Sequence, residues 1–216
     1  MIETGVRFDR LHSYHDLHLI LSKVDIPAAK PKTNYVDIPG SDGSLDMTET
    51  HGEVKYKDRE CKFTFTMPPV GESEAEALKT KVNNAINGKT FRITLDKDPG
   101  YYYLGRCEVD SYSVNKRIRQ IVVKAKVSPW KFKQNETVAV FALNGTEKIV
   151  SLSNSRRPVC PVITCTADTT VTFGQYTYGL EEGTHKVLNI RFTEGKNTLT
   201  LFSRGTVTFT YQEGEL

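Results

Sequence analysis

The sequence predicts a protein that is mainly β with one α-helix, with a β-sandwich-like domain over residues 1–133 and a second β-sandwich over residues 134–216. Two observations predict this class. Most of the chain alternates apolar and polar residues between turn-forming residues, and a single stretch has a helical repeat instead. The 216 residues, 38% of them hydrophobic, are enough for one large or two small domains with real cores.

Short strands are expected throughout residues 1–133. The clearest is Cys61–Met67, where Phe63 and Phe65 fall on one face and Thr64 and Thr66 on the other, as the two-residue period of a half-buried strand requires. Turn-forming residues separate it from the other strands. The predicted strands are Val6–Phe8, Leu17–Lys23, Tyr35–Ile38, Leu45–Glu49, Glu53–Tyr56, Cys61–Met67, Phe91–Leu95, Tyr101–Val109 and Ile118–Val127.

Two stretches in this part reverse the chain. The first, from Tyr35 to Glu49, contains the turn residues Pro39-Gly40 and Ser41-Asp42-Gly43, so the chain turns tightly twice. The second, Gly52–Met67, predicts a hairpin-like arm with its turn near Lys57-Asp58-Arg59.

One amphipathic helix is expected over Glu74–Asn87. Ser73 is placed as its N-cap, Glu76 completes a capping box, and Gly88 ends the helix. A single apolar stripe predicts that the helix lies across a sheet. Its residues are Ala75, Leu78, Val82, Ala85 and Ile86.

Near residue 133 the sequence becomes rich in Thr, Val and Gly. In the last strand, Val207 and Phe209 alternate with Thr206 and Thr208, which indicates one buried and one wet face. Short strands at this spacing are typical of a β-sandwich. The predicted strands are Val138–Leu143, Val159–Cys165, Thr169–Phe173, Lys186–Phe192, Thr198–Phe202 and Thr206–Tyr211.

No catalytic, cofactor or metal site is predicted. His12, His15 and His18 lie three residues apart, but the strand that follows would separate their imidazoles, so we interpret them as surface or partly hydrogen-bonded residues. Asp96 and Asp98 lie in a turn region, where Asp is favoured because it caps backbone donors. The formal net charge of +3 lacks the basic bias of a nucleic-acid binder, and no apolar run is long enough to suggest a membrane span.

Four features occur in order around the predicted helix. They are the turn IPG-x-DG-x-L at Ile38–Leu45, Arg59 before the Phe63 and Phe65 alternation, the aromatic run from Asp98 to Arg106, and the closing Ser128-Pro129-Trp130-Lys131. Together they resemble the amino-terminal domain of the distal tail proteins of siphovirus-type bacteriophages. The resemblance covers residues 1–133, and for residues 134–216 it implies a galectin-like β-sandwich.

This resemblance implies a structural virion protein of a phage or prophage. Such proteins form a hexameric ring at the distal end of the tail tube, and the ring joins the tube to the host-adhesion apparatus. The implied partners are further copies of the chain, the tail tube protein, the tape measure protein, a tail-associated fibre or lysin protein and a receptor-binding protein. No membrane partner is expected, DNA is expected only in passage, and assembly is expected in the bacterial cytoplasm.

Two surfaces are candidates for binding. The predicted arm could complete a neighbour's sheet by strand addition, and its candidate ring contacts are Lys55, Lys57, Asp58 and Arg59. The alternative function is a carbohydrate-binding module for host cell-surface glycans in the second domain. Its candidate contacts are Tyr176, Tyr178, His185 and Arg191.

Overall fold

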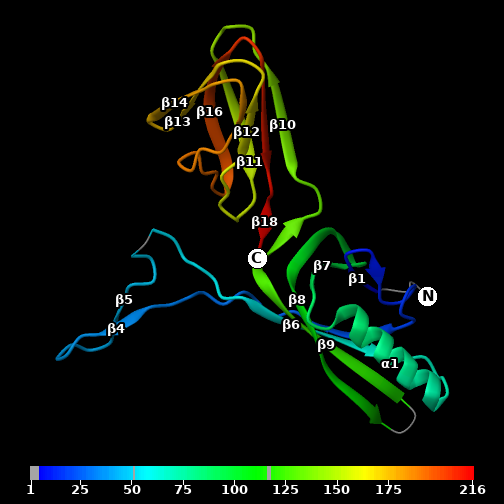
Figure 1. The fold of residues 1–216 in the computed structure, drawn as a ribbon. Helices are drawn as coiled ribbons and strands as arrows, with labels where there is room; N and C mark the ends of the chain where they lie inside the picture. Colours follow the sequence, from blue (N-terminus) through cyan, green and yellow to red (C-terminus); the bar gives the residue numbers. More distant parts are fainter. Residues whose placement is uncertain (1–4, 51, 116–117) are drawn as a thin grey trace. The chain divides into compact units, whose positions relative to one another are not determined.

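The computed structural model describes residues 5–50, 52–115 and 118–216. The chain divides into two compact units, Met1–Lys131 and Phe132–Leu216, and the division falls two residues before the boundary expected from the sequence. Strands dominate the described residues, which contain one α-helix, so the predicted fold class is confirmed (Figure 1).

The first unit is built on one large sheet with the strand order β2-β1-β7-β8-β9-β6-β3. The neighbouring strands whose register is described are antiparallel. The bounds are β1 (Val6–Phe8), β2 (Leu11–His12), β3 (Ile20–Asp25), β6 (Arg59–Thr66), β7 (Thr90–Leu95), β8 (Asp98–Asn115) and β9 (Ile118–Lys133). A separate two-stranded sheet joins β4 (Tyr35–Asp37) to β5 (Ser44–Asp46).

Strand β6 carries much of the core of this unit. Cys61, Phe63 and Phe65 are fully buried, and the ring of Phe8 on β1 lies 6.3 Å from that of Phe63. The intervening Lys62 is exposed. The two-residue alternation predicted for this strand is therefore confirmed.

The helix α1 (Glu72–Ile86) covers this core with Val82, Ile86 and Ala75, which are buried as the apolar stripe predicted. The prediction of Ser73 as N-cap was wrong, because Gly71 occupies that position and no side chain caps the helix. The helix therefore starts two residues earlier than expected. Gly88 follows its end with a φ of 75°, a backbone conformation that favours glycine and stops a helix.

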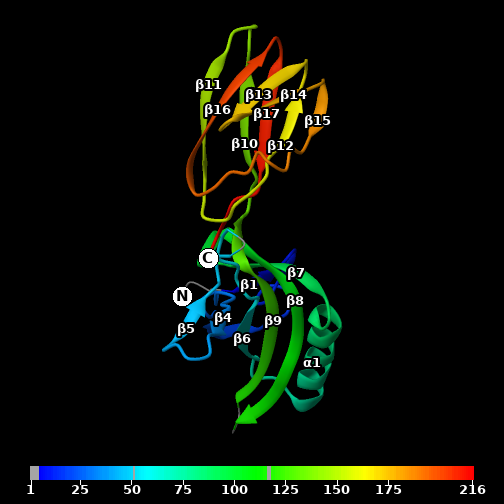
Figure 2. The same cartoon turned by 90° about the vertical axis from the view of Figure 1, so that its left-hand side faces the viewer.

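The second unit is a sandwich of two four-stranded sheets (Figure 2). Their orders are β10-β17-β12-β15 and β11-β16-β13-β14, and side chains from both fill one core. The rings of Phe192 and Phe209 lie 6.3 Å apart in this core. The bounds are β10 (Thr137–Ala142), β11 (Lys148–Asn154), β12 (Val162–Cys165), β13 (Thr169–Phe173), β14 (Tyr176–Leu180), β15 (Gly183–His185), β16 (Gly195–Ser203) and β17 (Thr206–Tyr211). The short strand β18 (Gly214–Glu215) lies outside these two sheets.

One predicted strand of this unit does not form. Residues 186–192 contain only a single bridge, between Val159 and Phe192, and the amide of Ile190 donates to the carbonyl of Val187 in a turn. Ile190 and Phe192 are fully buried all the same. The apolar pattern of this segment is therefore explained by packing against the core and not by pairing in a sheet.

Candidate functional site

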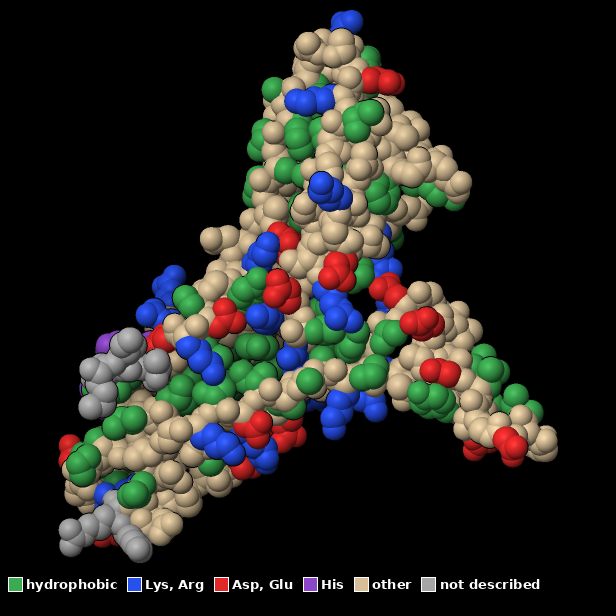
Figure 3. All heavy atoms as spheres, turned by 180° about the vertical axis from the view of Figure 1, so that it is seen from behind, with side chains coloured by type: hydrophobic (Ala, Val, Ile, Leu, Met, Phe, Trp, Pro, Cys, Tyr) green, Lys and Arg blue, Asp and Glu red, His purple; other side chains and the backbone are tan. Residues whose placement is uncertain are grey.

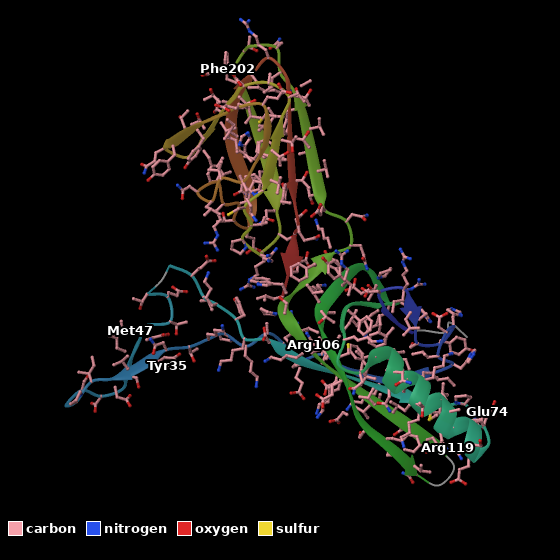
Figure 4. The ribbon with its side chains drawn as sticks, in the orientation of Figure 1. Tyr35, Met47, Glu74, Arg106, Arg119 and Phe202 are labelled. Carbon is pink, nitrogen blue, oxygen red and sulfur yellow. The ribbon has the colours of Figure 1, made fainter. Side chains whose placement is uncertain are left out.

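A largely exposed arm, described over residues 30–50 and 52–57, leads from the end of β3 toward β6 and carries the β4–β5 hairpin. In Figures 1 and 4 it extends away from α1, and the labelled Tyr35 and Met47 lie on it. Residues 31–46 are exposed throughout. An isolated two-stranded hairpin is only marginally stable in water. The β4–β5 hairpin forms a sheet of its own and its residues are exposed, so it lacks the further packing that would stabilise it.

The hairpin has one apolar and one polar face. Val36 pairs directly with Leu45, so both side chains lie on the same face, where they are 42% and 51% exposed. The neighbouring pair, Tyr35 and Asp46, points to the opposite face, as does Asp37. The apolar face is therefore open to a partner.

The arm is also acidic. Residues 33–52 contain four Asp or Glu residues and no Lys or Arg. Figure 3 shows apolar and acidic side chains on the arm. A partner surface that accepts the arm needs an apolar floor and positive charge.

The base of the arm is held by backbone hydrogen bonds. The amide of Lys32 donates to the carbonyl of Lys55 at 2.7 Å, and that of Lys57 donates to Lys30 at 2.8 Å. Pro31 and Tyr56 form the bridge between these bonds. The predicted hairpin over Gly52–Met67 was therefore wrong, because its first half pairs with residues 30–32 rather than with β6.

Arg59 is buried at the root of the arm rather than exposed at a turn. Its Nε donates to the carbonyl of Pro129 at 2.8 Å, and its guanidinium lies 5.6 Å from the ring centroid of Tyr103. A further bond of 3.5 Å reaches the carbonyl of Pro27. Arg59 thus ties the root of the arm to β9, and burial removes it from the candidate ring contacts.

The other three candidate contacts are exposed at the base of the arm. Lys55 pairs with Glu53 at 3.0 Å, and Asp58 lies 3.8 Å from Lys126. Lys57 is exposed as well. The structure brings these residues together on the surface, and their contact with another copy stays a prediction.

Among His12, His15 and His18, His12 holds neighbouring segments together through hydrogen bonds. His12 is buried, and its Nε2 lies 2.9 Å from Asp96 Oδ2, while its Nδ1 accepts hydrogen bonds from the amides of Tyr14 and His15. Two backbone donors at Nδ1 place the proton on Nε2, so His12 donates to Asp96. Among the described residues, no group of His, Cys, Asp and Glu could hold a metal ion.

The candidate glycan contacts lie on different elements of the second unit. Tyr176 is 56% exposed on β14, and Tyr178, on the same strand, packs against the core. His185 lies on β15 of the other sheet, where its Nε2 is 2.8 Å from the carbonyl of Glu181. Arg191 is exposed in the loop after β15. These four residues remain candidates for a glycan contact.

The chain belongs to the family of phage tail proteins with a RIFT-related domain, because the family model matches residues 10–141, which is more than half of the chain. It is similar in fold to the crystal structure of the Dit protein of SPP1, with a TM-score of 0.73 and 13% sequence identity over 99% of each chain. That structure is described as a paradigm of the hub adsorption apparatus in phages that infect Gram-positive bacteria. No curated protein matches this chain.

Among the residues that the structure describes, no helix has the length and apolar character needed to cross a membrane.

Proposed function

We propose that this chain is a structural protein of the distal end of a siphovirus-type phage tail, where six copies close head to tail into a ring. The observation that carries the proposal is the uncovered apolar face of the arm at Val36 and Leu45. A contact between the arm of one copy and a different surface of the next is heterologous, and such contacts close into rings when their rotation allows it. Membership of the phage tail family and the Dit-like fold support this role.

The proposed ring joins the tail tube to the host-adhesion apparatus. Its partners are the tail tube protein, the tape measure protein and a tail-associated fibre or lysin protein, with a receptor-binding protein as a further one. The ring assembles in the bacterial cytoplasm and then lies at the tail tip of the virion. This role requires positioning and contact area, and no catalytic residue enters it.

Solution mass tests the ring directly. Light scattering over a wide concentration range should give about 146 kDa, which is 6 × 24.3 kDa, and negative-stain images should show hollow six-fold particles. The double variant Val36→Asp and Leu45→Asp should shift the mass to the 24.3 kDa monomer, because charges on the apolar face must be desolvated in the contact.

The matched control for this experiment is Thr33→Asp with Ser41→Asp. It adds the same two charges to the arm without changing Val36 or Leu45, and it should still form the ring. A wild-type chain that stays monomeric at every concentration contradicts ring formation by this chain alone. Equal disruption by both double variants would show that charge, rather than the apolar face, controls assembly.

The carbohydrate-binding alternative rests on the exposed ring of Tyr176. A glycan array with host wall polymers tests it, since binding that Tyr176→Ala abolishes would assign a receptor role to the second unit. Absence of binding across the array would leave the scaffold role alone.

A further inference from the structure

The strand β10 is an edge strand of the second unit (Figure 1). It pairs with β17 on one side and, in the part of the chain that the structure describes, with no strand on the other. Its six residues, TVAVFA, include neither a charged residue nor a proline. Val138 and Val140 are 58% and 60% exposed. β10 is therefore an uncovered, uncharged edge with exposed apolar side chains.

The backbone of β10 presents hydrogen-bonding groups along this edge. The amide of Leu143, which continues the register of β10, donates to the carbonyl of Gly205 beside β17 at 3.0 Å. Because the residue pairs of an antiparallel ladder alternate between bonded and non-bonded, the odd-numbered residues of β10 bond to β17. Val138, Val140 and Ala142 therefore direct their N–H and C=O groups outward. Such a row is a template for one more strand.

A strand added at this edge would continue both faces of the sheet. On the inner side, Ala139 and Phe141 are only partly buried and lie at the margin of the core. The outer side is free of charge, because β10 and its neighbours β17 (TVTFTY) and β12 (VITC) contain no Lys, Arg, Asp or Glu. The segment that fits this edge is thus extended and uncharged, and apolar residues at alternate positions cover Ala139 and Phe141.

The other sheet edges of five or more residues are protected or weakened. β3 contains Lys23 and Asp25 and shifts its register between Leu21 and Lys23. β11 begins with Lys148, and β14 contains Gly179, which weakens a strand. Charged side chains, above all lysine, and bulges are the devices by which native sheets keep free edges from pairing. β10 has none of these devices, so its sequence suits a strand that is covered in the assembled particle.

We infer that β10 receives an extended segment of another tail protein by strand addition, an inference that rests on the proposed ring. Backbone bonds at Val138, Val140 and Ala142 supply affinity, and the fit of alternate apolar side chains over Ala139 and Phe141 supplies specificity. The β10 strand of a second copy does not compete inside the ring. Two identical strands pair antiparallel about a twofold axis, whereas neighbours in a head-to-tail ring are related by a different rotation.

Hydrogen exchange on the full-length chain tests the edge. The probe is an acetylated peptide of alternating Thr and Val with a lysine at each end. Without the peptide, the amides of Val138, Val140 and Ala142 should exchange freely, while those of Ala139 and Phe141 are protected by β17. Saturating peptide should slow exchange at the first three amides by about tenfold or more and leave the other two unchanged.

Two N-methylated peptides distinguish strand addition from apolar adhesion. When its Val side chains lie on the core side, the peptide turns the N–H groups of its Thr residues toward β10. Methylation of the Thr amides should therefore weaken binding, measured by fluorescence anisotropy, by about tenfold or more. Methylation of the Val amides, which face away from β10, is the matched control and should leave the affinity within about twofold.

A substitution in β10 gives an independent test. Val140→Pro removes one outward N–H group and no bond to β17, so it should weaken peptide binding by about tenfold. Val140→Thr keeps the N–H group and the β-branched shape, and it should bind like wild type. Protection of the β17 amides checks that the second unit remains folded in both variants.

Crosslinking identifies the occupant in assembled tail tips. A photoreactive amino acid in place of Val138 should crosslink to a peptide of a different tail protein. A crosslink to another copy of this chain would make a second copy the occupant and overturn the inference.

The outcomes separate this inference from the proposed function. A ring whose Val138, Val140 and Ala142 amides gain no protection from the peptide overturns strand addition and leaves the ring standing. An equal effect of the two N-methylated peptides overturns it as well. A chain that binds the peptide through β10 but never forms a ring contradicts the proposed ring and leaves strand addition at β10 standing.

Discussion

At the scale of single residues, Glu213 joins three segments of the second unit. Its Oε1 accepts hydrogen bonds from Lys133 Nζ at 2.6 Å and from the Thr137 hydroxyl at 2.5 Å. Its Oε2 accepts from the amide and the hydroxyl of Ser155, at 3.0 and 2.6 Å. Because the carboxylate is buried with both oxygens bonded, it stabilises the unit only while it is ionised.

The pKa of Glu213 leads to a prediction for stability against pH. Burial raises this pKa, but hydrogen bonds from Lys133, Ser155 and Thr137 outweigh burial and lower it from 4.5 to about 2. A folded-state pKa below the unfolded one stabilises the protein above about pH 4.5, and the contribution is lost as the pH falls toward 2. Its size is on the order of 3 kcal/mol.

Glu213→Gln should therefore lower the free energy of unfolding of the second unit by about 2–3 kcal/mol at pH 7, with a difference from wild type that shrinks between pH 4.5 and 2. Hydrogen exchange of the β17 amides measures this free energy. Glu147→Gln, at an exposed position, is the control and should have no such effect. An equal loss at both ends of the pH range would assign the effect to packing rather than to charge.

At the scale of elements, β8 and β9 lie in close backbone contact at Gly105. A Cβ atom at this position would lie 2.6 Å from Val127 Cα and would also meet the carbonyl of Lys126. Both neighbours are backbone, so neither can move aside cheaply. The absence of a side chain at Gly105 is what lets the two long strands pack here.

Gly105→Ala should accordingly destabilise the first unit by about 1–3 kcal/mol. Gly100→Ala on the same strand is the control, since a Cβ there meets nothing within 4 Å. Urea unfolding followed by the fluorescence of Trp130, the single tryptophan, reports on this unit. A Gly105→Ala variant as stable as Gly100→Ala would mean that β9 shifts to accommodate the methyl group.

The elements also show where sequence reasoning succeeds. β6 was predictable because its apolar residues, such as Phe63 and Phe65, recur every two residues. α1 was predictable because its apolar residues, such as Val82, recur with the helical period of 3.6 residues. The bounds of the arm were predicted wrongly because Lys57-Asp58-Arg59 has the composition of a turn. In the structure Arg59 is buried, and it donates a hydrogen bond to the carbonyl of Pro129, 70 residues away. No local pattern reveals a partner at that distance. The signal that could have found the arm is the run of residues 33–52 without Lys or Arg.

At the scale of the whole molecule, the composition changes near residue 133, two residues from the division between the two compact units. An open groove of about 560 Å³, lined by Ile20, Ala77 and Lys81 among others, has no such signal in the sequence, because it combines the start of β3 with the helix α1, some 50 residues later in the chain. Such a site depends on how the elements pack, and the periodicity of each element alone does not contain that information.

Because each unit has its own core, damage to one core should leave the other intact. Phe63 and Phe209 are both fully buried, one in each core. Phe209→Ala should lower the free energy of unfolding of the second unit by about 3–5 kcal/mol. The free energy of unfolding of the first unit, followed by Trp130 fluorescence, should stay within about 0.5 kcal/mol of wild type. Phe63→Ala should destabilise the first unit by a similar amount and leave the second unchanged. If both units lose stability with either substitution, they unfold as one cooperative body. The arm belongs to the first unit, so Phe209→Ala should still assemble into the ring, whereas Phe63→Ala should weaken the ring together with the core that supports it.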